Sequence, residues 1–580
     1  AYGFGFDIIR AMGHAHIPET EQLGGDGSRM FLRMASSGAE LYNRPVVTSE
    51  SLVWMGRDHM TTPQKTKIAV DKLFTSGVNQ VIFHGTPYRF HSEFFGVEGW
   101  QPFASPATKM MSFASNVSES DPYWKYQKDI NRYIARSQYL LRLGRRSTDV
   151  LVYYPFLGNT ILGQEGELLT RGVLEGPEPP LQALPINIDE RSSGPQPRWE
   201  ARAWRAIREL DRQGISWAWV NDDSLQAATW TDGAIDIRGN AYQAVLLLDV
   251  PWLPPRTSLR LAELAEEGAR VVVLGPAPAR QPGYHDFEEN DARVKAHSER
   301  ILASENVVPV REPAGLSVLA ETLSRNVTFA EPYSFLQHIG RALDDGSRLV
   351  FLWNTSDEDV RFQLTLSDGL ENAYWLDPAD GNVHVAQGDS ARSVDGALGP
   401  YGSLILYATS DGVPEQWLSP PPVQSRLDQV VALQTLDRWD LKAGDASRSG
   451  TALFDWRDDA ELRHASDVAT YTATFALDDK EPGQRYLVDL GQVYFTADVS
   501  VNGESAGSRL FAPYRLDVTD HLAVGENRIE VTVTPAPRNG FIGRAVAGEE
   551  PYERLEGQDD RLMAAGLVGP VRLVALEATD

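Results

Sequence analysis

The chain has 580 residues and a formal net charge of −26, from 54 lysines and arginines against 80 aspartates and glutamates. A surface this acidic repels phosphate backbones, which argues against nucleic acid as a partner. The absence of cysteine excludes disulfides, zinc-thiolate sites and thiol catalysis. No run approaches the roughly 18–20 apolar residues that a membrane helix needs, so we expect no membrane span.

The first 147 residues show the strand, helix, strand order of a parallel α/β unit. Apolar runs predict buried strands at 44–53 and 78–83, and the segment 63–75 between them is predicted to be a helix. A further helix is expected to begin at Asp121-Pro122, because aspartate caps helices and proline suits the first helical position. We expect that helix to end at Gly144.

Residues 148–330 predict a second α/β unit. Its strands are nearly continuous apolar runs, as expected when helices cover both faces of a sheet. The strands are expected at 149–156, 215–220, 244–250 and 270–275, with helices at 199–212 and 257–267.

Beyond residue 330 the helical pattern gives way to alternation of apolar and polar residues. Residues 331–411 predict a small β-sandwich with a turn at Asp380-Gly381. The proline-rich stretch 412–422 indicates a linker, and residues 425–580 alternate again, as in a second β-sandwich.

Carboxylates at strand ends and aromatics in loops are the residues left to carry chemistry. The chain lacks a glycine-rich phosphate loop, a GxSxG elbow, an HExxH motif and an EF-hand loop. Its 11 histidines are scattered. Two carboxyl groups cut glycosidic bonds, and sugars pack on aromatic rings, so this pairing of residue types suits sugar chemistry.

Glu50 is the best catalytic candidate, because it follows the apolar pair Val46-Val47 and barrel enzymes place catalytic groups at the carboxyl ends of strands. His84 follows the next strand and could hold a sugar hydroxyl. Each residue also has a plainer interpretation. Glu50 could be an exposed glutamate in a loop, and His84 could be a histidine whose hydrogen bonds go to the backbone. For Glu19 and Glu21, a solvated loop is the interpretation that the pattern favours.

Three early motifs together carry a family resemblance. The runs AYGFGFDIIRAMGHAHIPETE, RPVVTSESLVW and GVNQVIFHGTPY resemble glycoside hydrolase family 106, the inverting α-L-rhamnosidases. The later stretch GQVYFTADVSVNGESAG resembles the jelly-roll sugar-binding domain of β-galactosidase-like enzymes. The second α/β unit is similar to the flavodoxin-like domains that follow barrels in several glycosidase families.

The resemblance implies a multidomain α/β and all-β architecture. It comprises the C-terminal part of a (β/α)8 barrel at 1–147, a flavodoxin-like domain at 148–330, a small β-sandwich at 331–411 and a jelly-roll at 425–580. In the family the general acid precedes the base by more residues than the 49 that precede Glu50. We therefore expect the chain to begin inside the barrel, and an upstream part of the same protein to complete it.

The resemblance also implies roles for particular residues. Glu50 in the SES motif matches the general base, and Glu19 and Glu21 match the active-site wall. His84, Trp54 and Tyr88 are expected to grip the rhamnose of a glycoside or polysaccharide. A calcium ion is expected near the sugar, with ligands that the sequence does not identify, and we expect a periplasmic or secreted location.

Two other function classes stay open at this point. A retaining glycosidase of the β-galactosidase type would need its two carboxyl groups closer together, about 5–5.5 Å apart rather than 6.5–9.5 Å. A non-catalytic carbohydrate-binding protein would keep the sandwiches and an incomplete barrel. The anomeric configuration of the first product distinguishes the retaining glycosidase from the rhamnosidase. Hydrolysis of an aryl rhamnoside excludes the non-catalytic protein.

Overall fold

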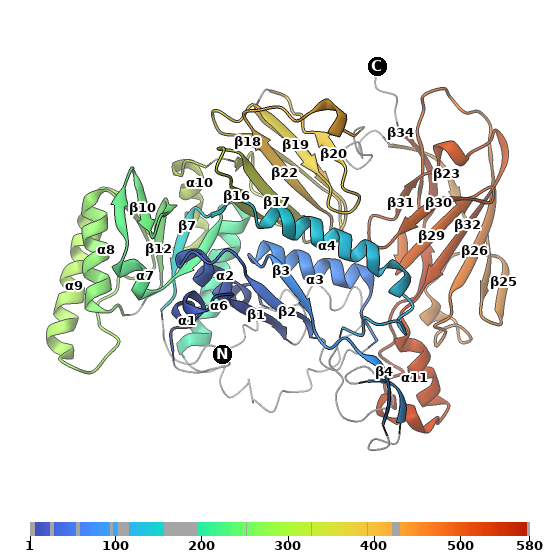
Figure 1. Cartoon of the computed structure of the whole chain (residues 1–580), viewed down its shortest axis with the longest axis horizontal. Coiled ribbons are helices and arrows are strands. Elements are labelled where there is room, and N and C mark those ends of the chain that lie inside the picture. Colours follow the sequence, from blue (N-terminus) through green and yellow to red (C-terminus); the bar gives the residue numbers. More distant parts are fainter. Residues whose placement is uncertain are drawn as a thin grey trace.

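The computed structural model describes residues 6–23, 28–53, 59–92, 97–101, 115–155, 195–250, 252–325, 327–390, 392–419 and 430–576. The elements in these ranges form four regions, two of mixed α/β structure and two of β-sheets (Figure 1). This confirms the mixed α/β and all-β class at a coarse level. None of the helices in the described ranges is long and apolar enough to cross a membrane.

The first region is a parallel sheet of order β1-β2-β3 with helices packed against it. Its elements are α1 (Ile8–His14), β1 (Glu19–Leu23), α2 (Arg29–Leu41), β2 (Thr48–Val53), α3 (Pro63–Thr75), β3 (Gln80–Phe83), the hairpin β4 (Tyr88–Ser92) and β5 (Val97–Gln101), and α4 (Gln127–Leu141). The helix predicted at 63–75 is confirmed. It begins where the Thr62 side chain accepts a hydrogen bond from the Lys65 amide and proline takes the first position.

Two boundaries in this region differ from the prediction. Strand β2 begins at Thr48 rather than residue 44, because the Asn79 amide holds the preceding segment: it accepts from the Val47 N–H at 2.9 Å and donates to the Pro45 carbonyl at 2.9 Å. Helix α4 begins at Gln127, because Asp121 caps a turn at the Tyr123 amide and a 3-10 turn precedes the helix.

The second region is a five-stranded parallel sheet of order β14-β13-β12-β7-β8, and its predicted strands are confirmed with shorter ends. Helix α9 and strand β14 went unpredicted, because α9 buries few apolar residues and so shows no clear stripe. The elements are β7 (Val150–Tyr153), α6 (Pro195–Arg212), β8 (Trp217–Val220), α7 (Asp222–Gln226), β9 (Thr229–Thr231), β10 (Ala234–Ile237), β11 (Asn240–Tyr242), β12 (Ala244–Leu248), α8 (Pro255–Glu267), β13 (Arg270–Leu274), α9 (Phe287–Ala303), β14 (Val307–Val310) and α10 (Val318–Thr322).

Helix α2 joins the first two regions by covering β8, the edge strand of the second sheet. The Ser37 hydroxyl accepts from the Trp219 amide at 3.0 Å, and the Trp219 indole donates to the Met30 carbonyl at 2.9 Å. The buried Arg33 guanidinium donates to the carbonyls of Trp217 and of Thr75, the last residue of α3. The β8 edge of the second sheet is therefore closed by a helix of the first region.

The third region is a pair of antiparallel sheets of orders β15-β18-β21 and β20-β19-β22-β17-β16-β6. Strand β6 precedes the whole second region in the chain, so that region is inserted between two paired strands, β6 and β16. In Figure 1, α4 lies along the six-stranded sheet that contains β16 and β17, and α3 lies beneath α4. The elements are β6 (Arg145–Ser147), β15 (Val327–Phe329), β16 (Leu336–Ala342), β17 (Arg348–Asn354), β18 (Val360–Leu366), β19 (Asn372–Leu376), β20 (Val383–Val385), β21 (Ser393–Leu398) and β22 (Ser403–Thr409).

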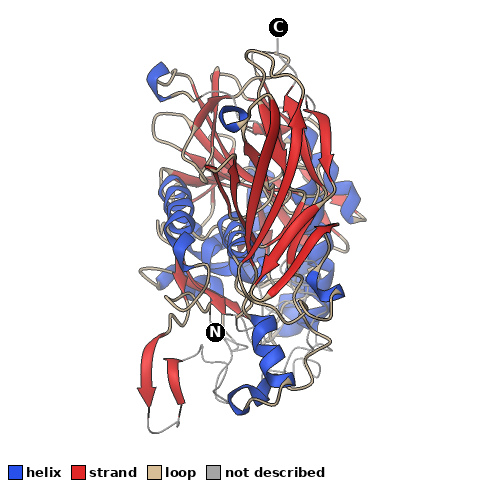
Figure 2. Ribbon diagram, turned by 90° about the vertical axis from the view of Figure 1, so that its right-hand side faces the viewer, coloured by secondary structure: helices blue, strands red, loops and turns tan. Residues whose placement is uncertain are grey.

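The fourth region is a β-sandwich whose long strands lie side by side in Figure 2. Its sheets have the orders β23-β34-β27-β31 and β25-β24-β26-β32-β29-β30, with a small pair β28-β33, and alternate residues of each long strand fill one apolar core. The elements are β23 (Val430–Leu436), β24 (Trp439–Ala443), β25 (Ala446–Thr451), β26 (Ala469–Leu477), β27 (Tyr486–Asp489), β28 (Gln492–Tyr494), β29 (Thr496–Val501), β30 (Glu504–Arg509), β31 (Arg515–Asp517), β32 (Gly525–Thr534), α11 (Arg538–Val546), β33 (Gly566–Gly569) and β34 (Val571–Leu576).

We predict that residues 425–580 fold on their own, because the sandwich has its own core. The isolated segment should show one cooperative thermal transition by circular dichroism, with a β-type spectrum. Val531→Asp should abolish the transition, because Val531 is fully buried, whereas Val524→Asp should keep it, because Val524 is exposed. A disordered, protease-sensitive segment would contradict the prediction.

Candidate active site

The register of β1 and β2 brings two glutamates face to face. Glu21 is paired with Glu50, and Glu19 with Thr48, across the parallel strands. Neighbouring strands lie about 4.8 Å apart and paired residues project from the same face, so the carboxyl groups of Glu21 and Glu50 are neighbours. The loop interpretation of Glu19 and Glu21 is wrong, because both residues lie on strand β1, although Glu19 is exposed to solvent as that interpretation expected. The polar sequence of this strand hid it, since it lacks the β-branched and aromatic residues that mark strands.

A cavity of about 180 Å³ opens over these carboxyl groups. One side is formed by the three glutamates at 19, 21 and 50, and the other by apolar side chains of helices α1 and α2. These apolar residues are Ile8, Met12, Phe31 and Met34. Sequence reasoning missed the apolar wall, because it assigned no helix to residues 8–14 or 29–41.

His84 follows β3 and binds Glu50 directly. Its Nδ1 lies 2.5 Å from Glu50 Oε1, with 15% of the histidine side chain exposed and 40% of the glutamate side chain. Two hydrogen bonds fix the main chain of His84. Its amide donates to the Ser51 carbonyl at 2.9 Å, and the Ser115 hydroxyl donates to its carbonyl at 3.0 Å. The sequence predicted both residues for the site but not that they bind each other.

Its surroundings set the protonation of Glu21. Burial raises the pKa of Glu21 to about 7, and the negative charge of Glu50 adds to the effect. Glu21 therefore holds its proton up to about neutral pH. A carboxyl group that keeps its proton at this pH can donate a hydrogen bond or a proton in the site.

Glu19 lies exposed at the mouth of the cavity, where the Thr48 hydroxyl donates to its Oε2 at 2.8 Å. Trp54 lies outside the described residues. Tyr88 begins strand β4, and its side chain also lies outside the described part. The sugar-binding roles of both aromatic residues stay predictions.

The calcium ion that the resemblance implies stays a prediction. Within the described ranges, no group of three or more histidine, aspartate or glutamate side chains is arranged to hold a metal ion.

Two family models match parts of the chain. Residues 14–165 match a glycoside hydrolase 106 model described as alpha-L-rhamnosidase. Residues 453–563 match a model described as the galactose-binding domain-like domain of glycosyl hydrolase 2. The first match includes the cavity glutamates and His84, and the second lies within the sandwich of the fourth region.

Individual proteins extend the comparison. A rhamnosidase structure from Novosphingobium sp. PP1Y has a TM-score of 0.65 and 20% identity, and covers 98% of this chain and 52% of that one. A "Putative beta-glucuronidase" from Formosa agariphila is 30% identical in an alignment of length 145 that covers 20% of this chain and 12% of that protein. This chain thus spans about half the length of the solved rhamnosidase and shares its fold. The resemblance that the early motifs predict is confirmed: the part of the chain that holds the site matches the alpha-L-rhamnosidases of glycoside hydrolase family 106.

Proposed function

We propose that this protein hydrolyses terminal α-L-rhamnosides, with Glu50 as the general base. The observation that carries the proposal is the cavity, in which carboxyl groups face an apolar wall. Rhamnose carries hydroxyl groups on most of its ring and a methyl group at C6. Side chains such as Met12 and Phe31 suit the methyl group, while the glutamates suit the hydroxyls.

The proposed reaction is a single displacement. Glu50 takes a proton from a water molecule, whose oxygen attacks the anomeric carbon as the bond to the leaving oxygen breaks. A protonated carboxyl group, which the resemblance places upstream of Glu50, gives its proton to the leaving oxygen. The products are rhamnose of inverted anomeric configuration and the free alcohol. This reaction needs about 6.5–9.5 Å between the two carboxyl groups, which leaves room for the water.

His84 and Glu21 support this reaction in different ways. His84, through its 2.5 Å contact, fixes the carboxyl group of Glu50 in one orientation, and we assign it as a positioning residue. Glu21, protonated near neutral pH, donates a hydrogen bond to a sugar hydroxyl from the wall of the cavity.

The facing glutamates favour a second candidate function. Glu21 and Glu50 occupy paired positions on neighbouring strands, and carboxyl groups about 5–5.5 Å apart are typical of retaining glycosidases. In that mechanism Glu50 would form a bond to the anomeric carbon, and Glu21 would first protonate the leaving oxygen and then take a proton from water.

We predict that Glu50→Gln lowers kcat for an aryl α-L-rhamnoside by at least about 10²-fold, because general-base catalysis contributes about 10²–10⁴-fold. The full-length protein should be used, and circular dichroism should show an unchanged fold. Glu415→Gln, an exposed glutamate far along the chain, serves as the matched control. If Glu50→Gln keeps more than about a tenth of the activity, Glu50 is not the base.

We predict that activity falls as pH rises through about 7, because Glu21 then loses the proton that it donates. In Glu21→Gln the amide donates at every pH, so the fall between pH 6 and 8 should disappear while activity at pH 6 is kept. Glu19→Gln should leave the fall unchanged. A loss of about 10²-fold or more in Glu21→Gln would instead identify Glu21 as the acid of the second candidate mechanism.

The configuration of the first-formed product decides between the two mechanisms. We expect proton NMR in the first minutes of hydrolysis to show the β-anomer of L-rhamnose, which then equilibrates. If the α-anomer appears first, the reaction proceeds with retention and the single displacement is wrong.

A further inference from the structure

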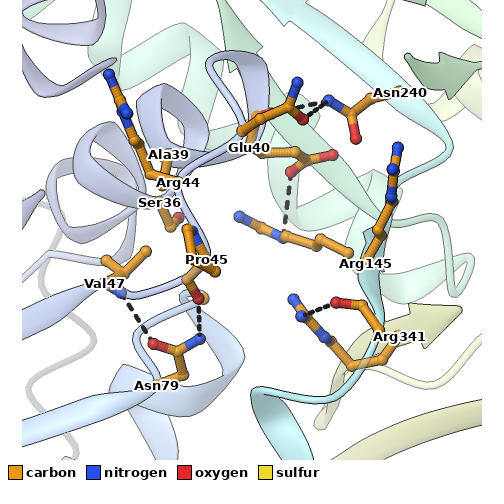
Figure 3. Close-up of a pocket in the computed structure, with 14 residues that line it drawn as sticks. Ser36, Ala39, Glu40, Arg44, Pro45, Val47, Asn79, Arg145, Asn240 and Arg341 are labelled. Atoms are coloured by element: carbon orange, nitrogen blue, oxygen red, sulfur yellow. Dashed lines mark hydrogen bonds and ion pairs between the residues drawn. The ribbon is translucent and has the colours of Figure 1, made fainter. Parts of the chain in front are cut away.

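A second cavity, of about 380 Å³, lies at the other end of the β1–β3 sheet. Val47 and Asn79, which immediately precede β2 and β3, line it, whereas Glu50 and His84 lie toward the carboxyl ends of these strands. Three regions meet there: α2 and the segments before β2 and β3 from the first region, Asn240 from the second, and Arg341 from the third (Figure 3).

The lining of this cavity is strongly cationic, in a protein whose net charge is −26. Among the described residues that line it, four are arginines and one is a carboxylate, Glu40. The arginines are Arg44, Arg145, Arg146 and Arg341. Figure 3 shows Glu40 on one side of the cavity and Arg341 and Asn79 on the other, with Arg44 and Arg145 at opposite flanks.

Arg146 is buried with part of its guanidinium unpaired. Its side chain is 7% exposed, and its Nε lies 3.3 Å from Glu40 Oε2. Its Nη1 is buried and has no hydrogen-bond acceptor among the described residues. Leaving a charged donor buried without an acceptor is costly, so this group is suited to an acceptor from a ligand.

Arg341 adds a second buried cation directly opposite the first. Arg146 and Arg341 are paired residues on the antiparallel strands β6 and β16, a position where like charges destabilise a sheet. Burial and the charge of Arg146 lower the pKa of Arg341 to about 10, although Glu40 partly offsets them. Arg341 donates to the carbonyls of Leu143 at 2.8 Å and Gly144 at 2.7 Å, which are neutral acceptors.

The cavity is also shaped to admit the guanidinium of Arg146. Gly77 lines it with a φ of +92°, and a Cβ at that position would lie 2.8 Å from Arg146 Nη1. Any larger residue would therefore press on the unpaired nitrogen.

We propose that this cavity binds a small oxyanion, a carboxylate, phosphate or sulfate group, between Arg146 and Arg341, with Arg44 and Arg145 at its rim. Guanidinium groups match the oxygens of these anions through paired, charge-assisted hydrogen bonds. The anion would neutralise the two opposed arginines and satisfy Nη1 of Arg146. The proposal does not rest on the hydrolytic function.

The test is titration of the protein with inorganic phosphate by calorimetry, at ionic strength held constant with sodium chloride. We expect saturable binding of one phosphate per chain. Arg44→Gln with Arg145→Gln should weaken it several-fold, because two positive charges are removed from the rim. Arg44 is half-buried and Arg145 is exposed, so the double variant should fold. Arg146→Lys should weaken binding although the positive charge is kept, because an ammonium group cannot form the paired hydrogen bonds of a guanidinium group. Arg132→Gln, an exposed arginine on α4, is the control.

A second arm distinguishes a free anion from the acidic group of a sugar. D-galacturonate is compared with D-galactose under the same conditions. Tighter binding of galacturonate than of phosphate, with no binding of galactose, would identify a sugar acid, and tighter binding of phosphate would identify a free oxyanion. The proposal is overturned if neither anion binds, or if binding is unchanged in both the double variant and Arg146→Lys.

Discussion

The buried guanidinium of Arg33 is the contact on which the relation between the two α/β regions depends. It lies 4.2 Å from the centre of the Trp217 ring and donates to carbonyls of two different regions, those of Trp217 in β8 and Thr75 in α3. Burying a charge costs several kcal/mol unless hydrogen bonds and neighbours compensate it. The two carbonyls and the indole ring supply that compensation only when α2 lies between the two sheets, so Arg33 fixes the place of this helix.

The candidate site inherits its shape from the same helix. Phe31 and Met34 of α2 form part of the apolar wall, on the helix whose Arg33 is held by β8 and α3. The carboxyl groups opposite this wall are placed by the strand register, which sets Glu21 against Glu50. The proton held by Glu21 follows from this placement, because burial and a neighbouring negative charge both favour its neutral form. Helix packing and strand pairing thus determine the chemistry of the cavity together.

Single helices and strands with clear local patterns could be predicted from the sequence, whereas strand pairing and contacts between elements could not. Helix α3 was predicted with its bounds, and Thr62 and Pro63 are local signals that mark where it begins. The strands around Val245 and Val272 were recognisable from continuous apolar runs. Strand β1 was missed because its residues are polar, and its identity as a strand comes from pairing with β2. The contact between His84 and Glu50 depends likewise on the alignment of β2 and β3, which no short stretch of sequence encodes.

The second region is inserted in the chain between β6 and β16, which are paired strands of one sheet. The chain leaves the six-stranded sheet of the third region after β6 and returns to it at β16, so the two ends of the inserted region lie close to one place. Arg146 and Arg341 are residues of these two strands, and Asn240 beside them belongs to the inserted region itself. A change of charge at this point therefore acts on both strands that flank the inserted region at once, because Arg146 and Arg341 are paired across them.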